Sequence, residues 1–67
     1  METVPRRFAM RLKRLRKAKR WTQVDLAHAT GLSPGYIARR ETRRHDPKFS
    51  TLVKIAKVFK VQVGDLL

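Results

Sequence analysis

The chain has 67 residues and a formal net charge of +12, from 17 Lys plus Arg against 5 Asp plus Glu. A chain of this length forms one small domain, and the absence of cysteine excludes disulfides, thiol nucleophiles and cysteine-ligated zinc. So large an excess of basic residues favours a polyanionic partner, nucleic acid above all, over a basic surface that is merely solvated.

Several other classes of protein are disfavoured by what the sequence lacks. It has no apolar run long enough to cross a membrane and no hydrophobic centre of a signal peptide. We therefore expect a soluble cytoplasmic protein whose residues 1–67 form a single domain, without a separate oligomerisation or effector domain. The sequence also has no nucleophile beside a base, no phosphate-cradling glycine loop and no pair of acids, so we expect neither enzymatic activity nor a cofactor.

The N-terminal segment 1–7 contains Pro5 and shows no hydrophobic periodicity, which predicts a loose arm. Arg6 and Arg7 are candidates for contact with DNA phosphates, and a frayed tail without function is the alternative.

An amphipathic helix is predicted over residues 8–19. It is indicated by apolar residues at spacings of four and three, namely Phe8, Leu12 and Leu15. Arg16 lies close to the buried edge of this stripe, where a guanidinium group needs a carboxylate partner. With only 5 acids in the chain, Glu41 is a credible partner. We expect an Arg16–Glu41 ion pair that ties the first helix to the third.

The start of a second helix is marked by a capping pattern. Thr22 and Asp25 form a capping box, in which the hydroxyl accepts from an early backbone N–H and the carboxylate reaches back. Trp21 and Leu26 stand where a hydrophobic staple fixes the angle at which the chain enters the helix.

A further helix start follows Gly31, which supplies the positive φ that a sharp turn needs without a steric cost. Ser33 is a natural N-cap, and Pro34 suits the first helical position, where its missing N–H is not needed. Short helices are therefore predicted over 24–30 and 33–40.

The remaining residues predict a loop, a helix and a final turn. The loop 42–47 closes with the turn signal Asp46-Pro47. A core-closing helix is expected over 50–59, with Ser50 as its cap and Phe49 as a staple or core residue. The last turn covers 61–67, and its apolar side chains are exposed unless something covers them.

Histidine offers no metal site in this sequence. His28 has no second His, Asp or Cys at ligand spacing, so a surface histidine is favoured over a metal ligand. His45 is interpreted as an ordinary loop residue.

The opening TQVDLA, residues 22–27, resembles the TQxxLA opening of the helix-turn-helix in the Cro/C1 repressor family, the xenobiotic-response-element-type DNA-binding modules. Further landmarks of that family fall at the expected spacing on Ala27, Gly31, Ile37, Glu41 and Pro47. The resemblance covers roughly Arg11 to Leu66. It implies an all-α fold, a compact bundle of four to five short helices of lambda-repressor-like type, with a salt bridge at Arg16 and Glu41.

The resemblance also implies that helix 33–40 enters the major groove of double-stranded DNA. The family's base-reading positions fall on Ser33, Pro34, Gly35 and Arg39. Pro34 and Gly35 replace the long amides of several phage repressors. Direct readout should therefore depend on Arg39, whose guanidinium matches the O6 and N7 atoms of guanine.

Contacts with the DNA backbone are expected around this helix. Gln23 begins the preceding helix and can donate to a phosphate oxygen, although an amide facing solvent is the alternative. Tyr36 is a candidate for a phosphate or a thymine methyl group, with a purely structural role equally open. The full set of expected backbone contacts is Thr22, Gln23, Tyr36, Arg40, Arg43 and Arg44. The family often has an apolar residue at Arg40 and a glycine at Arg43.

The function implied is a sequence-specific, nucleoid-associated transcriptional regulator, a repressor of prokaryotic or phage type that binds a palindromic operator as a homodimer. The dimer contact would consist of Val63, Leu66 and Leu67, unless these residues only close the core. One alternative is a protein-interaction module such as an antitoxin, whose partner protein covers this apolar end. Another is a cationic amphipathic helix over 8–21 for anionic membranes, against which Arg16 at the edge of the apolar stripe argues.

Overall fold

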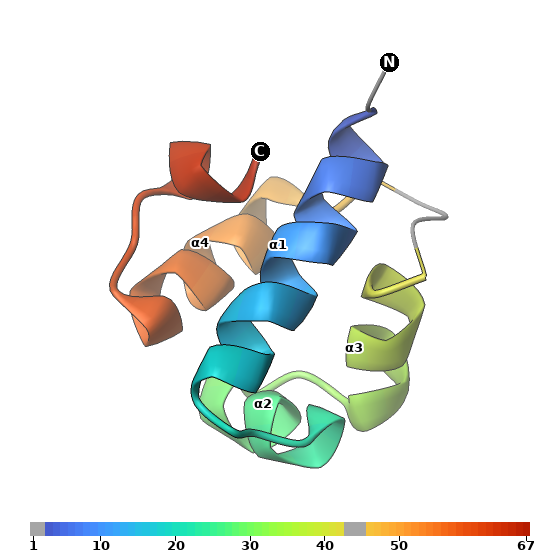
Figure 1. The fold of residues 1–67 in the computed structure, drawn as a ribbon, viewed down its shortest axis with the longest axis vertical. Helices are drawn as coiled ribbons and strands as arrows, with labels where there is room; N and C mark the ends of the chain where they lie inside the picture. The colour runs from blue at the N-terminus through green and yellow to red at the C-terminus, as the bar shows by residue number, and fades with distance from the viewer. Residues whose placement is uncertain (1–2, 43–45) are drawn as a thin grey trace.

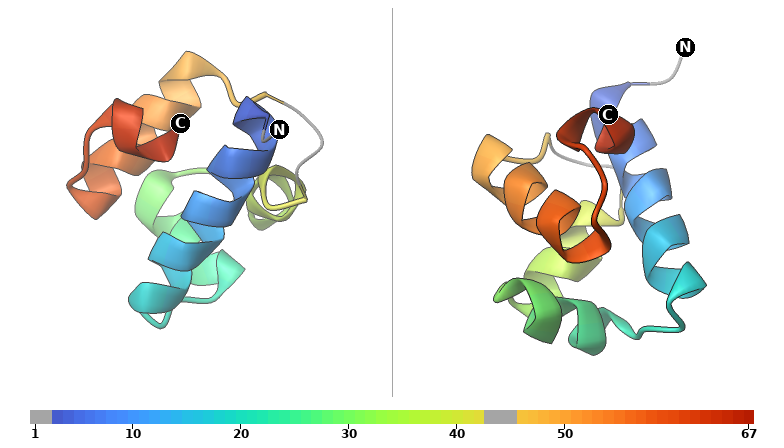
Figure 2. Two further views of the ribbon diagram at one scale, coloured as in Figure 1. Left: turned by 45° about the horizontal axis from the view of Figure 1, so that its top comes forward. Right: turned by 90° about the vertical axis from the view of Figure 1, so that its left-hand side faces the viewer.

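The computed structural model describes residues 3–42 and 46–67. These form four α-helices and a final 3₁₀ turn: α1 (Val4–Ala18), α2 (Gln23–Thr30), α3 (Pro34–Arg40), α4 (Phe49–Phe59) and η1 (Val63–Leu66). Helix α1 crosses the front of the molecule, with α3 on one side and α4 with η1 on the other (Figures 1 and 2). The described residues contain no strand, which confirms the expected all-α bundle.

The hydrophobic core draws on every one of these elements. Its largest fully buried side chains are Phe8, Leu12, Leu26, Ile37, Ile55 and Leu66. Burial of each contributes roughly 1.5–3 kcal/mol to the free energy of folding. Trp21 and Phe59 extend the core at the lower end of the bundle, with ring centroids 5.7 Å apart. Because α3 supplies only Ile37 to the fully buried set, its remaining surface is left for other contacts.

The expected loose arm over 1–7 is wrong for residues 4–7, which form the first turn of α1. The side chain of Thr3 caps this turn, accepting from the backbone N–H of Arg6 at 3.3 Å. Pro5 occupies the second helical position, where a backbone N–H would have no intrahelical acceptor, so it starts the helix instead of breaking it. Residues 1 and 2 lie outside the described part.

Helix α4 begins one residue earlier than expected, and the assignments of Ser50 and Phe49 are both wrong. Lys48 is the N-cap and makes no side-chain capping bond. Phe49 is the first helical residue, and 71% of its surface is exposed. The buried face of α4 is formed by Thr51, Leu52, Ile55, Ala56 and Phe59. Phe49 precedes the first buried residue of α4, Thr51, and therefore lies outside the core.

The C-terminal turn closes the core, which was one of the two roles that the sequence left open for its apolar side chains. Leu66 is 0% exposed and belongs to the central cluster, while Val63 and Leu67 are half-buried against it. The turn is capped by Asp65, whose carboxylate accepts from the backbone N–H of Gln62 at 2.9 Å. Leu66 is therefore unavailable as a dimer contact in the folded chain.

Replacing Gly31 with alanine should destabilise the domain, whereas the same change at Gly64 should not. Gly31 has a φ of +75°, and a Cβ at either glycine would meet no atom within 4 Å, so steric clashes are absent at both. The left-handed backbone alone should cost Gly31→Ala about 1–2 kcal/mol. Thermal unfolding should show a midpoint lower by about 4–8 °C for each kcal/mol lost. Equal midpoints for the two variants would contradict this account.

Candidate nucleic-acid interface

The two helices of the corner begin where the sequence predicts. Thr22 and Asp25 form the capping box: the Thr22 Oγ1 atom accepts from the Asp25 N–H at 3.0 Å, and the Asp25 carboxylate accepts from the Thr22 N–H at 2.8 Å. Ser33 Oγ accepts from the Tyr36 N–H at 3.0 Å, and Pro34 is the first residue of α3. The predicted caps are therefore confirmed.

The turn between α2 and α3 is fixed by backbone bonds and by packing. The N–H groups of Gly31 and Leu32 both donate to the Ala27 carbonyl, at 2.9 and 3.1 Å. Ala27 and Ile37 are buried on facing sides of the corner, as expected. Because α3 has only 7 residues, it is too short to persist alone in water and depends on this packing.

The expected ion pair joins α1 to the end of α3. Arg16 donates to Glu41 twice, from Nε to Oε2 at 2.7 Å and from Nη2 to Oε1 at 3.1 Å. Its third nitrogen, Nη1, donates to the Trp21 carbonyl at 2.8 Å. The side chains of Arg16 and Glu41 are only 12% and 3% exposed. The hydrogen bonds that Arg16 donates to Glu41 raise the pKa of Arg16 above its usual value.

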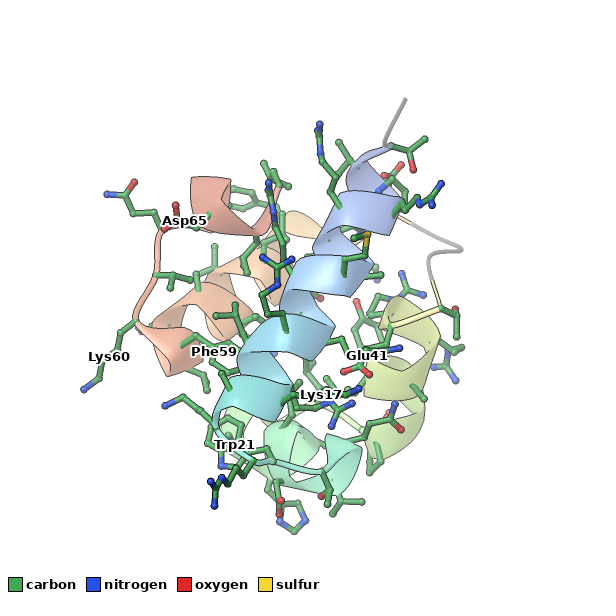
Figure 3. All side chains as sticks on the ribbon, viewed as in Figure 1. Lys17, Trp21, Glu41, Phe59, Lys60 and Asp65 are labelled. Atoms are coloured by element: carbon green, nitrogen blue, oxygen red, sulfur yellow. The ribbon has the colours of Figure 1, made fainter. Side chains whose placement is uncertain are left out.

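Gln23 joins the same network. Its Nε2 atom donates to Glu41 Oε1 at 3.2 Å, so Glu41 accepts from both α1 and α2 (Figure 3 marks Glu41). The sequence analysis predicted only Arg16 as a partner of Glu41 and missed Gln23. The signal that could have suggested this bond is the scarcity of acids, since Glu41 is one of only 5 in the chain. The bond occupies one of the two amide N–H groups of Gln23. Its other N–H and its amide oxygen remain for a phosphate or for water.

The outer face of α3 is open. Ser33, Gly35 and Arg39 are all exposed, as a base-reading surface requires. Arg39 extends back toward Gly35, where an added Cβ would lie 3.5 Å from the Arg39 Nη1 atom. Glycine at position 35 therefore leaves room for the guanidinium one turn closer to the start of the helix.

Tyr36 and Arg40 connect α3 to the following segment. The Tyr36 hydroxyl lies 2.8 Å from Thr51 Oγ1 of α4. Arg40 stacks over the Tyr36 ring at 4.9 Å and donates from Nη1 to the Asp46 carbonyl at 3.3 Å. These contacts favour a structural role for both residues, although the Arg40 Nη2 atom, which makes no hydrogen bond within the described residues, is left for a backbone phosphate.

The sequence profile of the helix-turn-helix family matches residues 12–66. The chain belongs to the Cro/C1-type helix-turn-helix family. It is 39% identical over 57 residues to the immunity repressor protein of Bacillus phage phi105, across 85% of this chain and 40% of that repressor. The chain thus spans about 40% of that relative's length. The family consists of DNA-binding transcriptional regulators, so the expectation of no enzymatic activity is confirmed.

Solved structures agree with this lambda-repressor-like helix-turn-helix fold. The restriction-modification controller protein C.AhdI from Aeromonas hydrophila gives a TM-score of 0.85 at 27% identity, over 94% of this chain and 96% of that one. The clp gene regulator ClgR from Corynebacterium glutamicum also gives 0.85, at 25% identity, over 97% of this chain and 69% of that one.

Three residues of the predicted loop, Arg43, Arg44 and His45, lie outside the described residues.

The described residues offer neither a metal site nor a membrane-spanning helix. His28 is exposed, and no group of three potential metal-binding side chains occurs in the described ranges. None of the helices described here combines the length and apolar character that a membrane crossing requires.

The capping box of the helix-turn-helix should make stability depend on pH in the acid range. The hydrogen bonds from Thr22 hold the pKa of Asp25 below its ordinary value of 3.8. A carboxyl group with a lowered folded-state pKa stabilises the fold above its unfolded pKa and loses that effect as pH falls through the folded value.

Asp25→Asn should therefore be less stable than the parent at neutral pH, and the difference should shrink once the pH falls below about 4. The urea midpoint of both proteins, measured from neutral to acid pH, checks this. A difference that stays constant over the whole range would rule out the carboxylate as its source.

Proposed function

We propose that this domain is a sequence-specific repressor that binds a palindromic operator as a dimer, with α3 in the major groove. The observation that carries the proposal is the division of α3 into two faces. Ile37 locks the inner face into the core, while Ser33, Gly35 and Arg39 are exposed on the outer face. A major groove about 12 Å wide accepts a helix presented in this way.

Base readout would depend chiefly on Arg39. Pro34 and Gly35 have no side-chain donor, and the Ser33 hydroxyl already caps the helix. An exposed guanidinium beside a glycine has room to aim its two donors at the O6 and N7 atoms of one guanine. Guanine at one position of each half-site would then be the strongest sequence preference.

Contacts with the DNA backbone would set the register of α3. Gln23 stands at the start of α2, where exposed N–H groups and the helix dipole favour an anion. Its bond to Glu41 holds the amide at this end of the helix. Thr22, Tyr36 and Arg40 are the further candidates for such contacts within the described residues, and Arg43 and Arg44 are candidates from the sequence alone.

A dimer would place two copies of α3 in successive major grooves, about 34 Å apart. Val63 and Leu67 are half-buried and remain candidates for the contact between copies, without Leu66. The antitoxin alternative loses support for the same reason, because the apolar end that a partner protein would cover is largely occupied by the core.

The proposal can be tested by selecting binding sequences from a random pool of duplex DNA at near-physiological salt. The enriched sequence is then titrated with the protein. We expect a palindrome whose half-sites are about one helical turn apart. Tight binding without any enriched motif, and with a steep salt dependence, would show a non-specific basic binder instead.

Arg39→Ala should weaken binding to the selected operator by about 1–3 kcal/mol and relax the preference at one base position. The exposed Lys57 of α4 is a matched control, because Lys57→Ala removes the same charge away from α3. Titration of both variants against the operator and its single-base variants gives the result. Equal losses on every sequence would exclude Arg39 from base readout.

A further inference from the structure

Helix α1 carries no acidic residue, and three of its arginines form a separate surface. Arg7, Arg11 and Arg14 follow one another at spacings of four and three, which places them on one side of the helix. Together with Met10 they line an open hollow of about 230 Å³. We call Arg7, Arg11 and Arg14 the arginine stripe.

Two of the three arginines of the stripe, Arg7 and Arg11, lie away from the end of α3. Arg11 and Arg14 border a neighbouring hollow that Asp65 of the C-terminal turn also lines. Glu41, at the end of α3, lies on the opposite side of α1 (Figure 3), where Lys17 borders it. Arg14 stands between the two sides and also reaches the hollow beside Glu41. A duplex seated on α3 would therefore leave at least Arg7 and Arg11 uncovered, so Arg7, a candidate phosphate contact from the sequence, would contact a second duplex and not the first.

The guanidinium groups of the stripe have no acceptor among residues 3–42 and 46–67. No side-chain hydrogen bond or ion pair is made there by Arg7, Arg11 or Arg14, and the Arg7 Nε atom is covered without a partner. Two acids border the stripe. The Oδ2 atom of Asp65 is bound to the Gln62 N–H, and Glu41, beside Arg14, accepts from Arg16 and Gln23. Three like charges within two helical turns repel one another, so an anion seated among them is favoured.

We propose that the arginine stripe is a second DNA-binding surface, which holds the phosphates of one duplex while α3 occupies another. Guanidinium groups bind phosphate oxygens as two-pronged donors. From Arg7 to Arg14 the stripe extends about 10 Å along α1. A duplex carries one negative charge per about 1.7 Å of its axis, so several phosphates lie within reach. Binding here is electrostatic and independent of sequence, and the chain bridges two DNA segments.

An anionic membrane fits this surface less well than DNA does. A helix that lies in a membrane must insert an apolar face. The apolar face of α1 is turned inward, with Phe8 and Leu12 fully buried in the core. The outward side of α1 exposes only part of two apolar side chains, Val4 and Met10, among its basic residues, which is too little to insert into a membrane, so its ligand is a soluble polymer of phosphates.

The test is capture of a second duplex. A biotinylated duplex of mixed sequence, about two helical turns long, is immobilised, saturated with protein and washed. A fluorescent copy of that duplex is then added. The parent protein should retain it. The variant Arg7→Gln/Arg11→Gln/Arg14→Gln should retain at least about tenfold less, while its binding to the first duplex changes little.

The matched control is Lys54→Gln/Lys57→Gln/Lys60→Gln, which removes the same number of charges from the exposed side of α4 and its C-cap. It should capture the second duplex as the parent does. All three proteins should show the same thermal midpoint, since the substituted side chains lie outside the core.

Three results would overturn the proposal. The stripe variant could capture as much as the control, as it would if two copies of α3 in a dimer held the two duplexes. It could lose the first duplex to the same degree as the second, which would place the stripe in the first contact. The parent could bind phosphatidylglycerol vesicles through the stripe and capture no second duplex. Failure to bind even the first duplex would instead count against the proposed function.

Discussion

Glu41→Ala should lower the free energy of unfolding by about 3–5 kcal/mol, because it leaves a nearly buried guanidinium without its acceptor. Arg16 loses two hydrogen bonds and Gln23 loses one. Domains of this kind have a total stability of only about 5–15 kcal/mol, so much of the population should unfold on mild heating. Urea unfolding followed by circular dichroism gives the value.

Two further variants distinguish loss of the ion pair from loss of a charge. Asp46→Ala removes an acid from an exposed position of the same basic chain and should change stability by at most about 0.5 kcal/mol. The double variant Arg16→Met/Glu41→Leu replaces the pair by apolar side chains and should recover much of the loss. If Glu41→Ala lowered the free energy of unfolding no more than Asp46→Ala does, the Arg16–Glu41 pair would contribute nothing to stability.

Leu66→Ala is expected to have the second largest effect, a loss of about 2–5 kcal/mol. Leu66 is 0% exposed and packs within the cluster formed by all four helices, so its removal leaves a cavity in the core. Leu67→Ala is the control, because Leu67 is only half-buried and its replacement should lower the free energy of unfolding by less.

The dependence on protein concentration decides between a core role and a dimer role for Leu66. A core residue lowers the thermal midpoint by the same amount at every concentration. A residue in the contact between two copies makes the loss depend on concentration, through mass action. A concentration-dependent loss in Leu66→Ala alone would therefore return Leu66 to the dimer contact.

The parts of the fold that sequence predicted well are those set by local chemistry. The starts of α2 and α3 depend on Thr22, Ser33 and Pro34, whose capping effects act within one turn. Gly31 was predictable because the left-handed backbone of the turn favours glycine. The Arg16–Glu41 pair was also predictable, since a buried-edge arginine had few acids to choose from.

The errors arose where tertiary packing decides. Pro5 suggested a break, yet at the second helical position it starts α1. Phe49 was interpreted as a staple or core residue from its place before Ser50, but no local signal shows that the buried face of α4 begins only at Thr51 and Leu52. For Leu66 the sequence left a dimer contact and closure of the core both open, because the burial of a last turn depends on α1 and α4 together.

The residues that would touch DNA could be named from the resemblance but not tested by the fold alone. Exposure of Ser33, Gly35 and Arg39 is compatible with base readout and leaves the partner base undetermined. The Tyr36–Thr51 contact was not predicted, since it joins side chains 15 positions apart through the packing of α3 on α4.

The three-way bonding of Glu41 makes the recognition surface and the whole domain a single cooperative unit. Helix α3 ends at a carboxylate that α1 and α2 both hold, and its other contacts reach α4 through Tyr36. Release of α3 would therefore break its contacts with α1, α2 and α4 together. The backbone amides of α3 should therefore exchange with solvent only as fast as global unfolding permits. A core substitution far from the DNA would then reduce operator occupancy in step with the folded fraction, without any change in the sequence that is read.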